Sequence, residues 1–334
     1  MFLKKIKTNF EKITRLKMKN LILLSILIFS FLSCSSYKKL SINYQDKLTD
    51  KVLLEKEILS LAKSYSGRIG VYAKNLKTNE EIKINADSLF PTASVIKLPI
   101  LVTLFQKAKD GSIDLFKEIL ISSKDKVGGA GVIQYFDGDT KIKLIDAATL
   151  MIILSDNTAT NAVIDQFADK HDDKLEAVNS TMEKLGLKNT KLLNKVFSYA
   201  TKKNTPEAKR FGLGYSSPFE MGQLLELIYR HQVIDSQYSE WIISILKNQQ
   251  DDTMIRRFLP YDNLKENESI IVANKTGAVD RSRIDVGIVY SPKCDFVIAI
   301  FADESTDTSW THDNKAQNAV ARTARLIYDY FNQE

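Results

Sequence analysis

A serine and a lysine three residues apart, Ser94 and Lys97, have the spacing of a catalytic pair. They lie in Pro91-Thr-Ala-Ser-Val-Ile-Lys-Leu-Pro99, at the start of an apolar segment. Residues i and i+3 of a helix share a face, so the serine hydroxyl and the lysine amine can meet there. Burial lowers the pKa of a lysine towards that of a usable base, and such a lysine can activate a serine without histidine. The pair therefore predicts a nucleophilic serine with a lysine as its proton acceptor.

The serine–x–x–lysine spacing alone is a weak signal, because the chain contains it at five further serines. These are Ser35, Ser36, Ser60, Ser123 and Ser244. Ser94 differs because it follows Leu-Phe-Pro and opens the apolar run 95–105, which predicts a helix buried on nearly all sides. A lysine inside such a helix is costly unless it has a function or a partner. The alternative interpretation is a serine at a helix start and a lysine that reaches out to solvent.

A second polar motif, Leu154-Ser155-Asp156-Asn157-Thr158, lies where two predicted helices meet. We expect a helix N-cap loop there, with Ser155 and Asn157 pointing off the helix ends. The tripeptide Ser-Asp-Asn occurs once in the chain. Taken alone, it is equally well an ordinary helix cap.

A third motif, Lys275-Thr276-Gly277, ends a predicted strand over residues 269–274. Glycine at this point would let the backbone of a substrate lie close against the strand edge, and an ordinary β-turn is the alternative. Two lysines that face one cleft repel each other, so Lys97 and Lys275 should each lower the other's pKa. Lys97 would then be partly neutral near pH 7, while Lys275 presents positive charge to an anionic substrate.

The elements that must position these motifs follow from hydrophobic periodicity. An amphipathic helix is expected over residues 51–65, and strands over 69–74 and 81–85 form a hairpin. Helical spacing recurs over 144–154, 157–168, 174–185, 218–231 and 236–248, with a long irregular stretch over 187–217. After residue 260 the period returns to two, with strands over 269–274, 284–290 and 295–301 and a closing helix over 312–331.

Strands near both ends of the chain, with helices between them, predict an α/β (α+β) fold. One antiparallel sheet is assembled from both termini and carries an all-α insertion. We place the α/β part at residues 51–90 and 262–332 and the all-α part at residues 91–261.

The net charge of +6 comes from the N-terminus. Residues 1–33 hold seven of the 47 basic residues and one of the 41 acidic ones, which leaves 40 of each sign in residues 34–334. A nucleic-acid-binding protein is expected to keep a basic excess in its folded part, so we expect no nucleic acid as a partner.

No motif in the sequence points to a metal or a cofactor. H-x-x-x-H and C-x-x-C are absent, and none of the three histidines lies in a motif. Gly128-Gly-Ala-Gly131 lacks the G-K-[ST] of a phosphate-binding loop and is predicted to be a flexible loop near the cleft. We therefore expect no metal and no cofactor.

The N-terminus has the pattern of an export signal. Basic residues crowd positions 4–19, and the uncharged run 21–33 is short for a bilayer span, which predicts a signal peptide over residues 1–33. Cys34 follows Phe-Leu-Ser, which resembles a bacterial lipobox. We predict lipidation of Cys34, a polar tether over residues 34–50 and a monomeric lipoprotein on a membrane of the cell envelope. A plain signal peptide or a short anchor is the alternative, and Met18 is an alternative start.

With its three motifs in this order, the stretch 51–332 resembles the penicillin-recognising serine enzymes, and most closely the class A β-lactamase family. The resemblance rests on Gly67-Arg-Ile-Gly-Val71, Ser94-Val-Ile-Lys97, Leu154-Ser-Asp-Asn-Thr-Ala-Thr-Asn161 and Lys275-Thr-Gly277. It implies a β-lactamase/transpeptidase-like fold, in which helices flank a five-stranded antiparallel sheet. It also implies a hydrolase that forms an acyl-enzyme with β-lactams or peptidoglycan-peptide-like amides.

The resemblance further implies catalytic roles for four residues. Ser94 is the nucleophile and Lys97 its proton partner, while Ser155 relays a proton to the leaving nitrogen. Lys275 presents positive charge to the substrate.

Substrate-binding roles follow from the same resemblance. Asn157 would hold the amide side chain of the substrate, and Thr276 and Gly277 would act with Lys275 at its carboxylate. The backbone N–H groups of Ser94 and Ala278 would form an oxyanion hole. Arg283 lies at about the distance where that family keeps an arginine near the substrate carboxylate.

The segment 187–217 departs from the family pattern. Class A β-lactamases carry a glutamate, in an E-x-x-L-N loop, that activates the water for deacylation. Here the only acid is Glu207. One alignment with the family's loop places Thr205 at the position of that glutamate, and others place residues 195–202 nearby. Seven basic residues crowd the segment: Lys188, Lys191, Lys195, Lys202, Lys203, Lys209 and Arg210.

Three functions follow from this combination. The first is a β-lactamase-like serine hydrolase with slow or unconventional deacylation. The second is a DD-peptidase-like, penicillin-binding or esterase-like enzyme on the same fold. The third is an inactive envelope lipoprotein that only binds its ligand, and the intact Ser94, Lys97, Ser155 and Lys275 argue against it.

Overall fold

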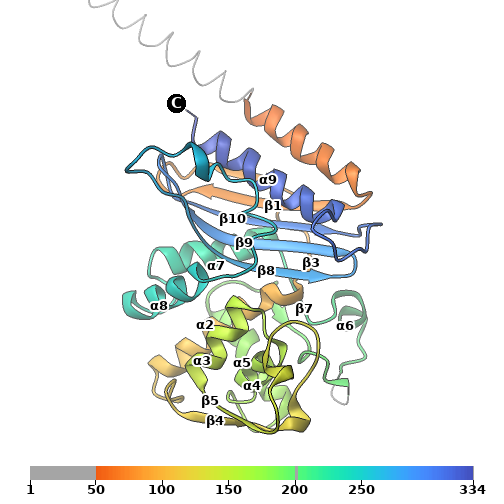
Figure 1. The fold of residues 1–334 in the computed structure, drawn as a ribbon, viewed down its shortest axis with the longest axis vertical. Helices are drawn as coiled ribbons and strands as arrows, with labels where there is room; N and C mark the ends of the chain where they lie inside the picture. Colours follow the sequence, from red (N-terminus) through yellow and green to blue (C-terminus); the bar gives the residue numbers. More distant parts are fainter. Residues whose placement is uncertain (1–49, 200–201, 334) are drawn as a thin grey trace, which may run out of the picture. The chain divides into compact units, whose positions relative to one another are not determined.

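A five-stranded antiparallel sheet, built from both ends of the described chain, organises the fold (Figure 1). The computed structural model describes residues 50–199 and 202–333. The strand order is β2-β1-β10-β9-β8. The strands are β1 Arg68–Asn75, β2 Glu81–Ile84, β8 Ile271–Val279, β9 Ser282–Tyr290 and β10 Phe296–Asp303. Because β1 pairs with β10, the sheet predicted from strands at both ends is confirmed.

The predicted hairpin is formed by β1 and β2, which pair antiparallel. Its turn is organised by Asn75, whose side-chain oxygen accepts hydrogen bonds from the backbone N–H groups of Lys77 and Thr78, both at 3.0 Å. Asn79 takes a positive φ of 61°, a conformation that asparagine tolerates better than most residues. The polar run between the two strands therefore encodes the turn directly.

Both faces of the sheet are buried, each against its own hydrophobic cluster. On β10, Val297, Ala299 and Phe301 belong to one cluster, while Phe296, Ile298 and Ile300 belong to the other. Successive side chains of a strand point to opposite faces, so a strand buried on both faces reads as a continuous apolar run.

Different helices cover the two faces (Figure 1). The helix that ends at Ser64 supplies Leu54, Ile58 and Ala62 to the second cluster, which α9 (Lys315–Phe331) completes. The first cluster joins the opposite face to α7 (Pro218–Tyr229) and to the helices around α2.

The helices predicted from periodicity are confirmed to within a few residues, although α4 is four residues shorter than expected. They are α3 Leu144–Ile153, α4 Asn157–Ile164, α5 His171–Lys184, α7 Pro218–Tyr229 and α8 Ser236–Lys247. The central helix, α2 (Lys97–Lys109), is buried from Lys97 to Phe105. The described residues also contain the short 3₁₀ turns η1 Ala93–Ile96, η2 Ser123–Asp125, η3 Ile133–Tyr135 and η5 Tyr261–Asn263.

The inserted segment 91–261 also contains short strands, so its description as all-α is corrected. One small sheet pairs β4 with β5, and a second has the order β3-β7-β6. The strands are β3 Phe90–Pro91, β4 Glu118–Ile121, β5 Thr140–Lys143, β6 Lys191–Leu192 and β7 Gly214–Ser216. The expected irregular stretch 187–217 thus holds β6, β7 and the short helix α6 (Pro206–Phe211). β3, β6 and β7, with two or three residues each, are too short to show a period of two in the sequence.

The signal peptide, Cys34 and nearly all of the tether lie outside the described residues. Within residues 50–199 and 202–333, no helix is both long and apolar enough to cross a membrane.

Candidate active site

A cavity of about 240 Å³ brings together residues of the first two motifs and the residue that follows the third. Ser94, Asn157 and Ala278 line it together with the segment from Asn194 to Tyr199. These residues are far apart in the sequence and come from η1, α4, β8 and the loop between β6 and α6. The fold therefore assembles one site from the three motifs.

Ser94 lies in the tight turn η1, one residue after a strained position. Ala93 has a positive φ of 44°, which is unusual for any residue other than glycine. The turn is held by hydrogen bonds from Thr92 N–H to the carbonyl of Gly214 and from Val95 N–H to the carbonyl of Thr92. The sequence predicted Ser94 on the first turn of a helix, whereas the 3₁₀ turn comes first and the α-helix begins at Lys97.

Lys97 is fully buried, and its amine forms three hydrogen bonds. The nitrogen Nζ donates to the Ser155 carbonyl at 2.6 Å, approaches the Ser155 hydroxyl at 3.2 Å and donates to Asn157 Oδ1 at 2.9 Å. Burial first, and then repulsion by Lys275, hold the pKa of Lys97 well below its usual value.

The expected direct pairing of Ser94 with Lys97 is not formed. Within the described residues, the Ser94 hydroxyl makes no hydrogen bond, because the amine is directed to Ser155 and Asn157. Ser94 instead lines the cavity with its hydroxyl uncommitted.

Ser155 lies at the junction of α3 and α4 with a positive φ of 54°. Its hydroxyl oxygen is 3.2 Å from Lys97 Nζ and 3.1 Å from Lys275 Nζ. The next residue, Asp156, caps α4 by accepting a hydrogen bond from Ala159 N–H at 2.8 Å. The motif is therefore both the predicted helix cap and part of the site, because the strained Ser155 turns towards the two amines.

The glycine loop 128–131 is fastened to the same motif. The Asp156 carboxylate accepts hydrogen bonds from the N–H groups of Val132 and Ile133, and Asn157 donates its side-chain N–H to the Gly128 carbonyl. A Cβ on Gly131, whose φ is 100°, would lie 2.3 Å from Asp156. The loop predicted to be flexible is thus held in place, and glycine is required there by close packing.

Lys275 lies inside β8, because the strand continues to Val279 instead of ending at Asn274. The β-turn interpretation of Lys275-Thr276-Gly277 is therefore wrong. Lys275 is fully buried, and its Nζ donates to the Thr276 carbonyl at 2.7 Å as well as to Ser155. Burial lowers the pKa of Lys275 to about 8, and the negative charges of Asp251 and Asp285 oppose that shift.

Gly277 brings β8 against the turn that carries Ser94. A Cβ at Gly277 would lie 2.7 Å from the Thr92 carbonyl oxygen, 3.0 Å from Val95 N and 3.1 Å from Ser94 N. The sequence suggested that this glycine leaves space for a substrate, and the structure shows that it leaves space for the protein's own backbone. Ala278 and Ser94 consequently line one cavity.

Arg283 takes a position that the sequence did not predict. Its guanidinium is buried and donates hydrogen bonds to the carbonyls of Val279, Ser282 and Ser309, and it lies 4.7 Å from the Trp310 ring centroid. Arg283 does not line the cavity that contains Ser94. The contacts favour a role in fixing the β8–β9 turn, and binding of a substrate carboxylate by Arg283 stays a prediction.

No acidic side chain lines the Ser94 cavity in the described part of the chain. Val196 lies on the cavity wall, and Asn161 fixes its backbone by accepting from its N–H and donating to its carbonyl, both at 2.9 Å. Glu207, the only acid of the segment 187–217, is exposed on α6 and is not among the lining residues. Of the two alternatives for the position of the family's glutamate, Thr205 does not line the cavity, whereas residues 195–199 and Lys202 do.

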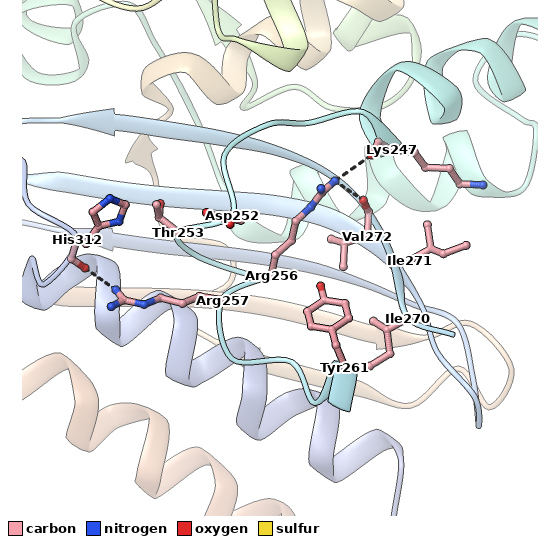
Figure 2. A pocket seen from close by; sticks show the side chains of 10 residues that line it. All are labelled: Lys247, Asp252, Thr253, Arg256, Arg257, Tyr261, Ile270, Ile271, Val272 and His312. Carbon is pink, nitrogen blue, oxygen red and sulfur yellow. Dashed lines mark hydrogen bonds between the residues drawn. The ribbon is translucent and has the colours of Figure 1, made fainter. Parts of the chain in front are cut away.

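A separate cavity of about 590 Å³ lies along the first half of β8 (Figure 2), and Ser94 is not among its lining residues. Arg256 crosses it and donates to the carbonyls of Lys247 and Val272 and to Asn274 Oδ1. Asn274 in turn donates to the buried Asp285, whose pKa burial raises to about 7. These hydrogen bonds hold Asn274, the strand residue next to Lys275, in place. This network was not predicted from the sequence.

Clusters of three or more His, Cys, Asp or Glu side chains that could hold a metal ion are absent from residues 50–199 and 202–333.

The chain is similar to known beta-lactamases in sequence. The model of the beta-lactamase enzyme family matches residues 53–331. Beta-lactamase 1 of Bacillus cereus is 24% identical over 274 residues, which cover 79% of this chain and 81% of that protein. Beta-lactamase VEB-1 of Pseudomonas aeruginosa is 22% identical over 307 residues, covering 87% and 94%.

Solved structures show the same fold. A beta-lactamase from Sphaerobacter thermophilus superposes with a TM-score of 0.72 at 23% identity, covering 84% of this chain and 97% of that one. PBP-A, solved as a leucine-to-glutamate mutant in an acyl-enzyme complex with penicillin G, has a TM-score of 0.70 at 24% identity, covering 85% and 97%. The family model spans all three motifs, and the chain belongs to the beta-lactamase enzyme family.

Proposed function

We propose that this protein is a serine hydrolase that opens β-lactams through an acyl-enzyme on Ser94 and releases the acyl group slowly. The observation that carries the proposal is the Ser155 hydroxyl between two buried amines, beside a cavity that contains Ser94. This arrangement supplies a nucleophile, a proton acceptor and a proton path within one site.

The acylation step uses groups that the fold gathers at one site, of which Lys97 and Ser155 are already in contact. Ser94 Oγ attacks the lactam carbonyl carbon and gives its proton to the neutral amine of Lys97. The backbone N–H groups of Ser94 and Ala278 stabilise the oxyanion that forms. Ser155 then passes a proton to the lactam nitrogen as the carbon–nitrogen bond breaks, and Lys97 restores the proton of Ser155.

Binding of the substrate carboxylate is assigned to Lys275. Lys275 is protonated below a pH of about 8 and attracts the carboxylate of the substrate, while Asn157 and Thr276 offer hydrogen bonds. The two buried lysines therefore have different tasks. Lys97, with its low pKa, accepts the proton of Ser94, and Lys275, with its positive charge, binds the carboxylate of the substrate.

Slow deacylation follows from the lining of the cavity. Hydrolysis of an ester needs a water molecule that loses a proton close to the carbonyl carbon, and a carboxylate within hydrogen-bond reach is the usual base. The described lining offers Val196 and Asn157 but no carboxylate. Lys97 is then the nearest candidate base for the second step as well.

Mass spectrometry of the intact protein tests this proposal. We expect incubation with penicillin G to add the mass of the whole drug within seconds to minutes, and the adduct to persist for minutes or longer. Ser94→Ala should abolish the adduct, whereas Ser60→Ala and Ser123→Ala should not. An adduct that survives in Ser94→Ala would overturn the assignment of the nucleophile.

A DD-peptidase or penicillin-binding activity is the second candidate, and the absence of a carboxylate from the described cavity lining favours it. Such an enzyme would release D-alanine from a peptide that ends in D-alanyl-D-alanine, with the same Ser94 acyl-enzyme. Chromatographic detection of D-alanine distinguishes the two functions, because a β-lactamase turns over nitrocefin without releasing it from the peptide.

We also propose that the protein is exported and anchored through a lipid on Cys34, as a monomer on the cell envelope. The charge pattern of residues 4–33 supports this proposal. Cys34→Ser should leave the precursor unprocessed or release the protein from membranes. A mature protein that begins elsewhere and carries no lipid would contradict it.

A further inference from the structure

A second cavity, of about 540 Å³, continues from the one that contains Ser94. The two cavities share four lining residues: Ala93, Gly212, Leu213 and Val279. We call the second the distal cavity and define it by its charged lining residues Lys209, Arg210, Asp280, Arg281, Asp303 and Glu304. A substituent on an acyl group bound to Ser94 can therefore extend into the distal cavity without leaving the protein surface.

Two of the three acids of the distal cavity share one cation that does not line it. Arg68, from β1, forms ion pairs with Asp303 at 3.0 Å and with Glu304 at 3.2 Å. Asp303 also accepts a hydrogen bond from the Ser282 hydroxyl at 2.6 Å. Arg68 therefore offsets one of these two negative charges.

The three cations have no comparable partners among the described residues. Arg281 donates to the carbonyl oxygens of Ser305 and Glu304, which are neutral acceptors, so its positive charge remains. Arg210 lies 4.8 Å from the Phe211 ring centroid, and Lys209 makes no ion pair in the described structure. The lining holds three cations and three acids, and Arg68 behind Asp303 and Glu304 adds a fourth cation, which leaves the distal cavity with a net positive charge.

We propose that the distal cavity binds an anionic group at the far end of the acyl side chain, so that the preferred substrates are β-lactams or related amides whose acyl group carries a second carboxylate. The inference rests on the proposed acylation of Ser94 and adds a substrate class to it. Arg281, Lys209 and Arg210 attract this carboxylate, while Lys275 attracts the carboxylate on the leaving side. Two cationic subsites therefore flank the reacting carbonyl.

A matched pair of substrates tests the proposal on the full-length protein. The first is a cephalosporin whose amino group carries a glutaryl side chain, and the second is the same compound with the glutaryl carboxylate as its methyl ester. The measured quantity is the apparent second-order rate constant of Ser94 acylation, followed by intact mass. Because each exposed ion pair contributes little, we expect a preference of several-fold to about tenfold for the free acid at low salt. The preference should shrink at high salt, since salt screens exposed charges.

Three single variants locate the effect. Lys209→Gln and Arg281→Gln should each reduce the preference for the free acid, while acylation by the methyl ester keeps its wild-type rate. Lys188→Gln removes the same charge from an exposed position outside the distal cavity and should leave the preference unchanged. The methyl ester rate in each variant shows whether the site is still folded.

Each result has a defined meaning. Equal rates for the two substrates, or a preference that Lys209→Gln and Arg281→Gln do not reduce, overturn the proposal about the distal cavity. A preference lost in Lys202→Gln alone overturns it as well, because Lys202 lines the Ser94 cavity instead. Failure of both substrates to acylate the wild-type protein would reject the proposed function itself.

Discussion

Lys97 and Lys275 share one hydroxyl: Ser155 Oγ lies 3.2 Å from the first amine and 3.1 Å from the second. The two lysines are fully buried, and repulsion by Lys275 contributes to the lowered pKa of Lys97. For Lys275 itself, the main cause of the shift is burial, so the mutual effect expected from the sequence is found in one direction. A hydroxyl placed between two amines of different pKa can accept a proton from one and donate to the other, which is what a relay requires.

Removal of Lys97 should affect the chemical step. We expect Lys97→Ala to slow acylation of Ser94 by about 10²–10⁴-fold, the usual effect of losing a general base. Lys107→Ala, on the same helix but partly exposed, is the control and should acylate at the wild-type rate. Stopped-flow measurement with nitrocefin gives both rates, and an unchanged rate in Lys97→Ala would remove Lys97 from the mechanism.

The pH dependence should reveal the charge of Lys275. Its pKa in the folded protein is about 8, so the amine loses its positive charge as pH rises through that value. Acylation by a substrate with a carboxylate on the leaving side should therefore fall above about pH 8. The methyl ester of that carboxylate should show no such fall. If the acylation rates of both substrates fell equally above about pH 8, Lys275 would not be the residue that binds the substrate carboxylate.

A carboxylate added at Val196 should accelerate deacylation. Val196 lines the Ser94 cavity, and Asn161 holds its backbone, so Val196→Glu places an acid beside the ester in a fixed position. We expect the lifetime of the penicillin adduct to fall by at least about tenfold, consistent with the gain of a general base.

The control for this prediction is Val196→Gln, which has the same size without the charge and should leave the lifetime long. Glu207→Gln should also have little effect, because Glu207 is exposed outside the cavity. Rapid turnover by the wild-type protein that Glu207→Gln abolishes would show that the loop moves during catalysis and would reject slow deacylation.

Gly277→Ala should damage both the fold and acylation. The new Cβ would lie 2.7 Å from the Thr92 carbonyl oxygen and about as close to the backbone of the Ser94 turn, so β8 and η1 must move apart. We expect a loss of about 1–3 kcal/mol in the free energy of unfolding, as for other overpacked sites. Gly128→Ala, where the nearest atom is 3.6 Å away, is the control for stability. Equal denaturant midpoints for the two variants would show that the close approach is not required.

Local patterns in the sequence determined most of the secondary structure and the identity of the motifs. The alternating apolar residues predicted β1, β2, β9 and β10 because each strand needs only its own residues to show its buried faces. Helical periodicity predicted α3, α5, α7 and α8 for the same reason. Ser94 and Lys97 were recognisable because the pair and its apolar surroundings lie in one continuous stretch of the sequence.

The tertiary structure decided how the motifs meet. Ser155 and Lys275 are 120 positions apart, and only the tertiary structure brings Lys275 Nζ to 3.1 Å from Ser155 Oγ. The same packing explains Gly277, whose partner is the backbone at Thr92, and Arg283, whose partners are carbonyls of a turn and of a distant loop. None of these contacts leaves a periodic trace in the sequence.

The segment 187–217 shows the difference most clearly. Its composition left Glu207 as the single acid, but did not show which residue faces Ser94. Hydrogen bonds from Asn161 to the backbone of Val196 decide that register. A loop of short strands and polar turns has no repeating pattern, so its conformation is determined by the side chains of distant elements that satisfy its backbone.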